Sequence, residues 1–117
     1  MLRVMRLTFV YAPVSDLPTA LAYYRDTLGL DESWREGDHT VAFALPGTDV
    51  QIMVSIDSDP AGPMYLVDSA AAWVAEHPEL TPQSALSEIP DGAVVRYADP
   101  AGNAFYVFDQ AGAAERT

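Results

Sequence analysis

The pattern of apolar and polar residues predicts two unusual strands, one near each end of the chain. Residues 103–109 place Phe105 and Val107 on one face of the expected strand and three further apolar side chains on the other. Residues 4–12 are likewise apolar on both faces. Such a strand is covered on both faces, by the core on one side and by a cavity or a partner on the other. We therefore expect both strands to border a binding cavity or an interface.

Two stretches have the period of an amphipathic helix. In the first, apolar residues recur at spacings of three and four and predict a helix near 17–28. The second predicted helix lies near 69–77. Each follows residues whose side chains cap helix N-termini. The candidate caps are Ser15 or Asp16 for the first helix and Asp68 or Ser69 for the second.

Turn residues divide the rest of the chain into short strands. In Asp99-Pro100-Ala101-Gly102-Asn103, the aspartate can bond its own backbone, the proline presets φ, and the glycine permits positive φ. This run therefore predicts the turn of a hairpin. The other expected strands fall near 31–36, 40–45, 49–56, 64–67, 83–89 and 92–98.

The order strand, helix, three strands occurs twice, which predicts an internal duplication. Val14-Ser15-Asp16 matches Val67-Asp68-Ser69 at a spacing of 53, and Gly47 matches Gly102 at a spacing of 55. The expected fold class is α+β, built from two βαβββ modules. With 117 residues, the chain is expected to form a single domain, with module one about 1–57 and module two about 62–117.

Composition limits the partners. The formal charge is −11, so we expect neither nucleic acid nor an anionic membrane as a partner, and a cationic ligand is favoured. The chain has no cysteine, which excludes disulfides and thiolate sites and fits a cytoplasmic protein. The chain contains no run of about 18 apolar residues, so no membrane span is predicted.

Three features together resemble the glyoxalase / bleomycin resistance protein / dioxygenase superfamily, also called the vicinal oxygen chelate fold. They are Val14-Ser15-Asp16-Leu17 with the helix segment 22–30, the duplicated βαβββ order, and Asp99-Pro100-Ala101-Gly102-Asn103. The resemblance implies curved mixed sheets around a shared cavity, and chains of this length that commonly dimerise. An expected sheet with two apolar faces also leaves apolar surface exposed, so we predict a homodimer.

The resemblance also implies four inward positions that hold a metal in metal-using members. These positions correspond here to Phe9, Gln51, Gly62 and Tyr106, where Gly62 is obtained from Phe9 by the spacing of 53. Divalent metals need imidazole nitrogens or carboxylate oxygens, and only the amide of Gln51 offers a usable neutral oxygen. We therefore predict no metal site and no cofactor.

Other metal candidates have simpler interpretations. His39 is expected to be an exposed turn residue, and His77 to lie at the end of the second helix, where it favours the helix dipole. The run 57–59 (Asp-Ser-Asp) lacks the glycine and the distant glutamate of a calcium loop, and is expected to be a solvated linker.

These observations predict metal-independent binding of a small molecule, similar to the sequestration of a drug by bleomycin-resistance-like proteins. The ligand is expected to be flat or aromatic, and neutral to cationic. Alternatives are an enzyme of the lyase, isomerase or dioxygenase type with a non-standard site, and an accessory domain without turnover. Trp34 is expected either at the rim of the site or in the core. The predicted ligand-binding residues are Phe9, Tyr11, Gln51, Met53, Gly62, Met64, Tyr106 and Phe108.

Overall fold

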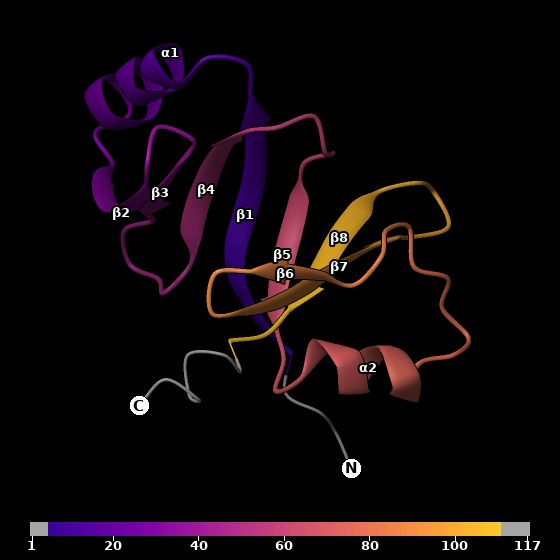
Figure 1. Ribbon diagram of the computed structural model, residues 1–117. Coiled ribbons are helices and arrows are strands. Elements are labelled where there is room, and N and C mark those ends of the chain that lie inside the picture. The colour runs from indigo at the N-terminus through magenta and orange to yellow at the C-terminus, as the bar shows by residue number, and fades with distance from the viewer. Residues whose placement is uncertain (1–4, 111–117) are drawn as a thin grey trace. The chain divides into compact units, whose positions relative to one another are not determined.

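The computed structural model describes residues 5–110, and these divide into two compact units. The first unit is 8–62, and the second is formed by 5–7 together with 63–110. Each unit has one helical segment against a four-stranded mixed sheet, so the predicted α+β class and the two βαβββ modules are confirmed (Figure 1). No helix within residues 5–110 is long and apolar enough to cross a membrane.

In the first unit the strand order is β2-β3-β4-β1, with β1 parallel to β4 and the other neighbours antiparallel. Its elements are β1 (Arg6–Val14), α1 (Leu17–Leu21), η1 (Ala22–Thr27), β2 (Asp31–Glu36), β3 (Thr40–Ala44) and β4 (Gln51–Ile56), and only the first two residues of β1 fall outside the unit.

The second unit repeats this order as β5-β8-β7-β6, again with its first and last strands parallel. Its elements are β5 (Gly62–Leu66), α2 (Ala70–Glu76), β6 (Ser87–Ile89), β7 (Gly92–Ala98) and β8 (Ala104–Phe108).

The first helical segment differs from the expected continuous α-helix over 17–28. It begins as predicted at Asp16, whose carboxylate accepts hydrogen bonds from the backbone and hydroxyl of Thr19, and these bonds lower the pKa of Asp16. The α-helix ends at Leu21 and continues as the π-helix η1. There the Leu28 amide donates to the Tyr23 carbonyl five residues back, at 2.9 Å. In the second unit Ser69 is the cap, and its hydroxyl accepts from the backbone of Ala72.

Each helical segment packs on one face of its own sheet. The first core joins α1 to alternate residues of β3 and β4, and Tyr24 stacks on Phe43 with ring centroids 5.6 Å apart. The second core joins Trp73 of α2 to alternate residues of β7 and β8. It includes Phe105 and Val107, so these two side chains share a face as the sequence predicted.

The predicted hairpin turn forms between β7 and β8. One carboxylate oxygen of Asp99 accepts from the backbone amides of Ala101 and Asn103, and the other accepts from the Asn103 side chain. These bonds, those from Asn103 first, lower the pKa of Asp99. Gly102 has φ +91°, so the positive φ expected of this glycine is present.

Tyr97 lies in the second core with 1% of its surface exposed, and its hydroxyl has no hydrogen-bond partner among the described residues. Burial raises the pKa of Tyr97 above its ordinary value of 10.0, and the Glu79 carboxylate raises it further. An unpaired buried hydroxyl costs free energy because water solvates it in the unfolded chain.

We therefore expect Tyr97→Phe to be as stable as the parent protein or about 1 kcal/mol more stable in urea unfolding at about pH 8. Because the raised pKa belongs to the folded state, stability is complete below about pH 10 and falls as the pH rises through that pKa. Tyr97→Phe has no hydroxyl to ionise at this position, so its stability should not show this part of the fall at alkaline pH. A variant less stable than the parent by more than about 1 kcal/mol would contradict this role of the hydroxyl.

Candidate functional site

We call the face of the first sheet that points away from α1 the first open face. Val54 and Ile52 of β4 pack toward the helix, so strand alternation places Gln51 and Met53 on the opposite face. Strand β1 pairs Phe9 with Gln51 and Tyr11 with Met53. The structure therefore brings four predicted ligand-binding residues together in two neighbouring rows: Phe9, Gln51, Tyr11 and Met53.

Aromatic and amide groups are adjacent on this face. The ring of Trp34, from β2, meets Phe9 edge to face, with centroids 5.9 Å apart and planes at 89°. Such pairs stabilise by about 1 kcal/mol beyond the area they bury. The side-chain oxygen of Gln51 accepts from the Ser33 hydroxyl at 2.5 Å, and the same hydroxyl lies 3.2 Å from the Ala42 carbonyl. Trp34 is half-buried and lies beside Phe9.

A polar cluster adjoins the same face, and the sequence did not predict it. The Tyr11 hydroxyl donates to one oxygen of Asp57 at 2.8 Å, and Nε2 of His39 lies 3.8 Å from the other oxygen. Nδ1 of His39 is 2.8 Å from the Thr40 hydroxyl and 3.2 Å from the Ser55 hydroxyl, and the two hydroxyls are 2.7 Å apart. His39 and Asp57 were expected to be a turn residue and a linker residue without a common site.

The matching face of the second sheet, the second open face, presents Tyr106 and Phe108 of β8. Strand β5 pairs Met64 with Tyr106, and β7 pairs Arg96 with Tyr106 from the other side. The Arg96 guanidinium also donates to the backbone carbonyl of Gln83 at 3.2 Å. Arg96 was not among the predicted residues.

Strand pairing corrects the internal alignment of the two units. A shift of 55 positions carries the pair Phe9–Gln51 onto the pair Met64–Tyr106. The counterpart of Phe9 is therefore Met64, and not Gly62 as the spacing of 53 indicated. Gly62 begins β5 two residues earlier, so its place on the same face follows from strand alternation.

The residues at the inward positions do not fit a metal ion. Phe9 has no donor atom, and the side-chain oxygen of Gln51 is already an acceptor for Ser33. At the matching positions of the second unit, Met64 offers a thioether and Tyr106 a phenol, which are poor ligands for hard divalent ions. Within residues 5–110, no group of three or more His, Asp or Glu side chains is placed to hold a metal.

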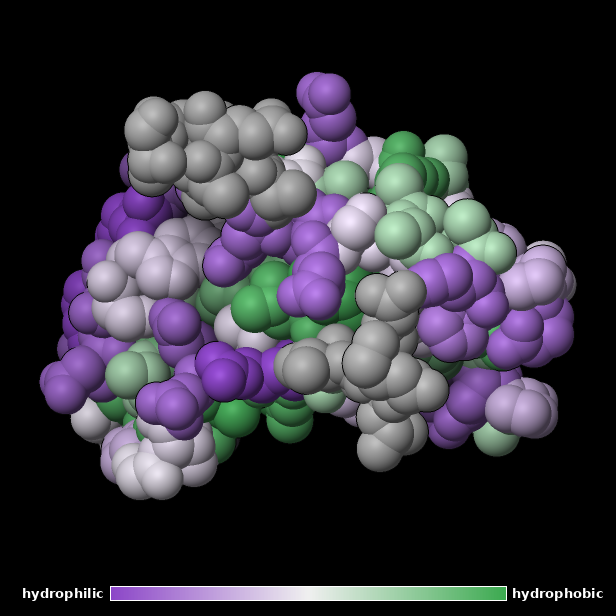
Figure 2. Space-filling view, turned by 90° about the horizontal axis from the view of Figure 1, so that it is seen from below, coloured by the Kyte–Doolittle hydropathy of each residue, from purple (hydrophilic) through white to green (hydrophobic). Residues whose placement is uncertain are grey.

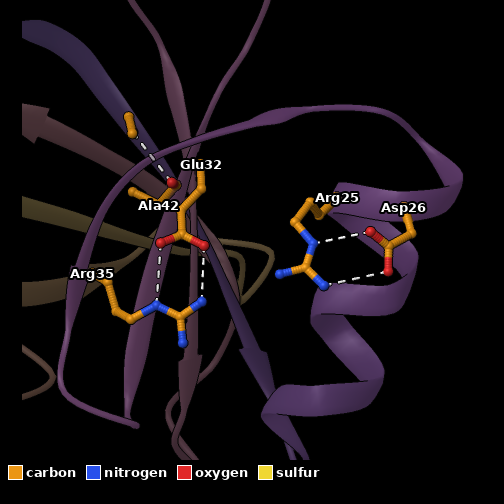
Figure 3. Close-up of polar contacts among 6 residues, drawn as sticks. Arg25, Asp26, Glu32, Arg35 and Ala42 are labelled. Atoms are coloured by element: carbon orange, nitrogen blue, oxygen red, sulfur yellow. Dashed lines mark hydrogen bonds and ion pairs between the residues drawn. The ribbon is translucent and has the colours of Figure 1, made fainter.

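Two arginines of the first unit are paired with neighbouring carboxylates. Arg35 forms a fork with Glu32 on the edge strand β2, at 2.8 and 3.1 Å, and Arg25 pairs with Asp26 on η1 at 2.9 Å (Figure 3). Their hydrogen bonds lower the pKa of Glu32 and of Asp26. These exposed pairs add little stability, but they neutralise the positive charges that lie on this unit's surface.

Comparisons with solved structures identify the fold. The chain is similar to a structure described as NAD-dependent benzaldehyde dehydrogenase from Legionella pneumophila, with a TM-score of 0.69 and 11% identity over 86% of this chain and 96% of that one. It is similar to methylmalonyl-CoA epimerase from Mycobacterium tuberculosis, with a TM-score of 0.68 and 17% identity over 100% and 97%. A glyoxalase/bleomycin resistance protein/dioxygenase superfamily member from Vibrio splendidus 12B01 has a TM-score of 0.60 and 17% identity over 91% and 98%.

The chain therefore has the vicinal oxygen chelate fold of the glyoxalase / bleomycin resistance / dioxygenase superfamily, as the sequence motifs indicated. At these identities the comparisons show the fold alone. The names of the similar proteins describe unlike chemistries, so function has to be argued from the site. No protein-family model and no curated protein sequence matches the chain.

Proposed function

We infer that this protein binds a flat aromatic small molecule, neutral to cationic, on the first open face, without a metal ion and without changing it covalently. This is the mode of sequestration expected of a bleomycin-resistance-like protein. The observation that carries the proposal is the edge-to-face pair of Phe9 and Trp34 beside the amide of Gln51. Sites for small molecules are mostly apolar with a few fixed polar groups, and this face has that composition.

The shape of the ligand follows from the rings. An edge-to-face pair leaves a ring face and a ring edge that an additional planar ring can contact by stacking or in a T-shaped arrangement. The Gln51 amide is held by Ser33 through its oxygen, so its nitrogen is the donor that can meet a carbonyl or ring nitrogen of a ligand. Tyr11 and Met53 extend the same surface by one further row.

The charge of the ligand follows from the surroundings. The chain carries a formal charge of −11, and the Asp57 carboxylate, with 36% of its side chain exposed, adjoins the first open face. Arg25 and Arg35 are paired with their own neighbours. A cation is therefore attracted to this face, and aromatic faces also stabilise cations.

The proposal is tested by titrating chelator-treated protein with proflavine, a flat aromatic cation, while the fluorescence of Trp34 is recorded in a Trp73→Phe background. We expect saturable quenching with one ligand per chain, unchanged by added divalent metal. Fluorescein, a flat aromatic anion, is the matched probe and should bind at least about 10-fold more weakly. The proposal is wrong if proflavine does not bind, or binds only when a divalent metal is supplied.

We also propose that the protein is a homodimer. Large hydrophobic side chains remain exposed in the described residues, among them Val10 at 39% and Ile56 at 38%. Figure 2 shows hydrophobic surface between hydrophilic side chains on the face that it presents. Exposed apolar surface of this kind marks interfaces. Light scattering at tens of micromolar should give the mass of two chains, and the mass of one chain would contradict the proposal.

A further inference from the structure

The polar cluster beside the first open face connects groups that can carry protons. Asp57 stands between the hydroxyl of Tyr11 and the imidazole of His39, with one carboxylate oxygen toward each. The 2.8 Å contact to Tyr11 is a hydrogen bond, and the 3.8 Å separation from His39 is that of an ion pair when the ring is protonated. The groups are therefore in the order His39, Asp57, Tyr11.

The hydroxyls behind His39 fix its orientation. Thr40 and Ser55 are buried, with 6% and 2% of their surface exposed, and both reach Nδ1. When Thr40 donates to Nδ1, Ser55 can donate to Thr40, and Nε2 carries the proton that points toward Asp57. When Nδ1 carries the proton, the Thr40 hydroxyl accepts from it and donates to the Ser55 hydroxyl instead. The pair thus stabilises both neutral tautomers of the ring in one orientation.

The two ends of this series have different access to solvent. His39 has 56% of its side chain exposed, whereas Tyr11 as a residue is only 6% exposed. Tyr11 also lies two residues from Phe9 on β1, a distance of about 7 Å along the strand, and on the same face. One end can therefore exchange protons with water, and the other reaches the surface proposed to bind the ligand.

We propose that His39, Asp57 and Tyr11 form a proton relay that gives the first open face an acid–base activity toward an aromatic carbon acid. The proposal rests on the proposed function for the binding of the ring. Ligands without an acidic carbon–hydrogen bond are bound unchanged, and only a carbon acid also undergoes a reaction. Tyr11 is the catalytic residue that contacts the ligand, Asp57 is its proton acceptor, and Thr40 and Ser55 are positioning residues. No metal enters the step.

The step balances for 5-nitrobenzisoxazole, a flat aromatic carbon acid that serves as the probe. The proton on its ring carbon moves to the Tyr11 oxygen while the Tyr11 proton moves to Asp57. The electron pair of the broken carbon–hydrogen bond forms the third bond of a nitrile, and the nitrogen–oxygen bond breaks to release a coloured nitrophenolate. When the ring proton of His39 is on Nδ1, its Nε2 accepts the proton of Asp57 and then releases it to water. Proton transfer by a positioned group accelerates a reaction by about 100-fold or more.

The experiment measures ring opening and probe binding in the same preparations. Tyr11→Phe keeps the ring but cannot pass a proton, and Asp57→Asn still accepts from Tyr11 but cannot be protonated. We expect each to bind the probe within a factor of about 3 of the parent and to lose about 100-fold in rate. Asp38→Asn, a carboxylate in the turn beside His39, is the matched control and should leave both quantities unchanged.

The outcomes separate this inference from the proposed function. Parent protein that binds the probe but opens it no faster than acetate and imidazole in solution contradicts the relay and leaves the binding proposal intact. Equal rate losses in Asp38→Asn and Asp57→Asn also contradict it, because they would show a general effect of charge. Parent protein that does not bind the probe overturns the relay on this face and argues against the binding proposal itself.

Discussion

Gly92→Ala is expected to lower the free energy of unfolding by at least about 3 kcal/mol. A Cβ at this position would lie 2.0 Å from the backbone oxygen of Asp109 and 2.7 Å from both its carbonyl carbon and its Oδ1. The nearest atom belongs to the backbone, so no side-chain rotation relieves the clash. Asp109 cannot move cheaply, because its buried carboxylate accepts from the backbone amides of Ala70 and Ala93 at 2.6 and 3.2 Å.

Gly37→Ala separates this steric effect from the conformational freedom of glycine. Gly37 has φ +54° and open space around an added Cβ, so its substitution should cost only about 1 kcal/mol of backbone strain. Gly92 does not have positive φ, so its cost should come from the clash alone. Urea unfolding measures both. The packing described at Asp109 is wrong if Gly92→Ala is no less stable than Gly37→Ala.

Phe9→Ala is expected to weaken proflavine binding about 5- to 150-fold, because the ligand loses the burial of one ring against another. Phe9 is only 8% exposed, so its truncation also destabilises the fold, and binding has to be measured well below the thermal midpoint of the variant. Phe9→Leu keeps most of the volume and removes only the aromatic contact. It should weaken binding by a factor of about 2 to 10.

Tyr23→Ala is the matched control for Phe9→Ala. Tyr23 is an aromatic residue of the same unit, 54% exposed on η1, and packs edge to face against Tyr24 with centroids 5.3 Å apart. It lies on the helical side of the unit and should leave proflavine binding unchanged. Equal losses in Tyr23→Ala and Phe9→Ala would place the ligand elsewhere than on the first open face.

The order of elements was predictable because each signal is local. Strand alternation placed Phe105 and Val107 on the core face of β8, and Asp99 with Gly102 formed the expected turn. The change from α1 to η1 was not predictable in this way. The apolar residues keep helical spacing through both segments. That spacing therefore does not reveal the π-type hydrogen bond from Leu28 to Tyr23.

The counterpart of Phe9 was misplaced because the spacing between the units is not constant. Seven positions separate Phe9 from the cap Asp16, whereas five separate Met64 from the cap Ser69. An alignment anchored on the caps therefore falls two residues short on the preceding strand. Only strand pairing, which is a long-range property, fixes the match.

The cluster around His39 was missed for a related reason. His39, Asp57 and Tyr11 come from a turn, a strand end and a strand, and only the β1–β4 and β3–β4 pairings bring them together. One local signal was present. Thr40 and Ser55 are hydroxyl residues within the otherwise largely apolar strands β3 and β4. A hydroxyl that is buried in such a strand needs a hydrogen-bond partner nearby.

A crystal structure of the chelator-treated protein with proflavine is the most direct test of whether a flat ring binds on the first open face without a metal. We expect the planar ring of the ligand to contact Phe9 and Trp34, its polar edge to face Gln51, and no metal ion to lie between ligand and protein. A ligand seated elsewhere, or one joined to these side chains through a metal ion, would contradict it.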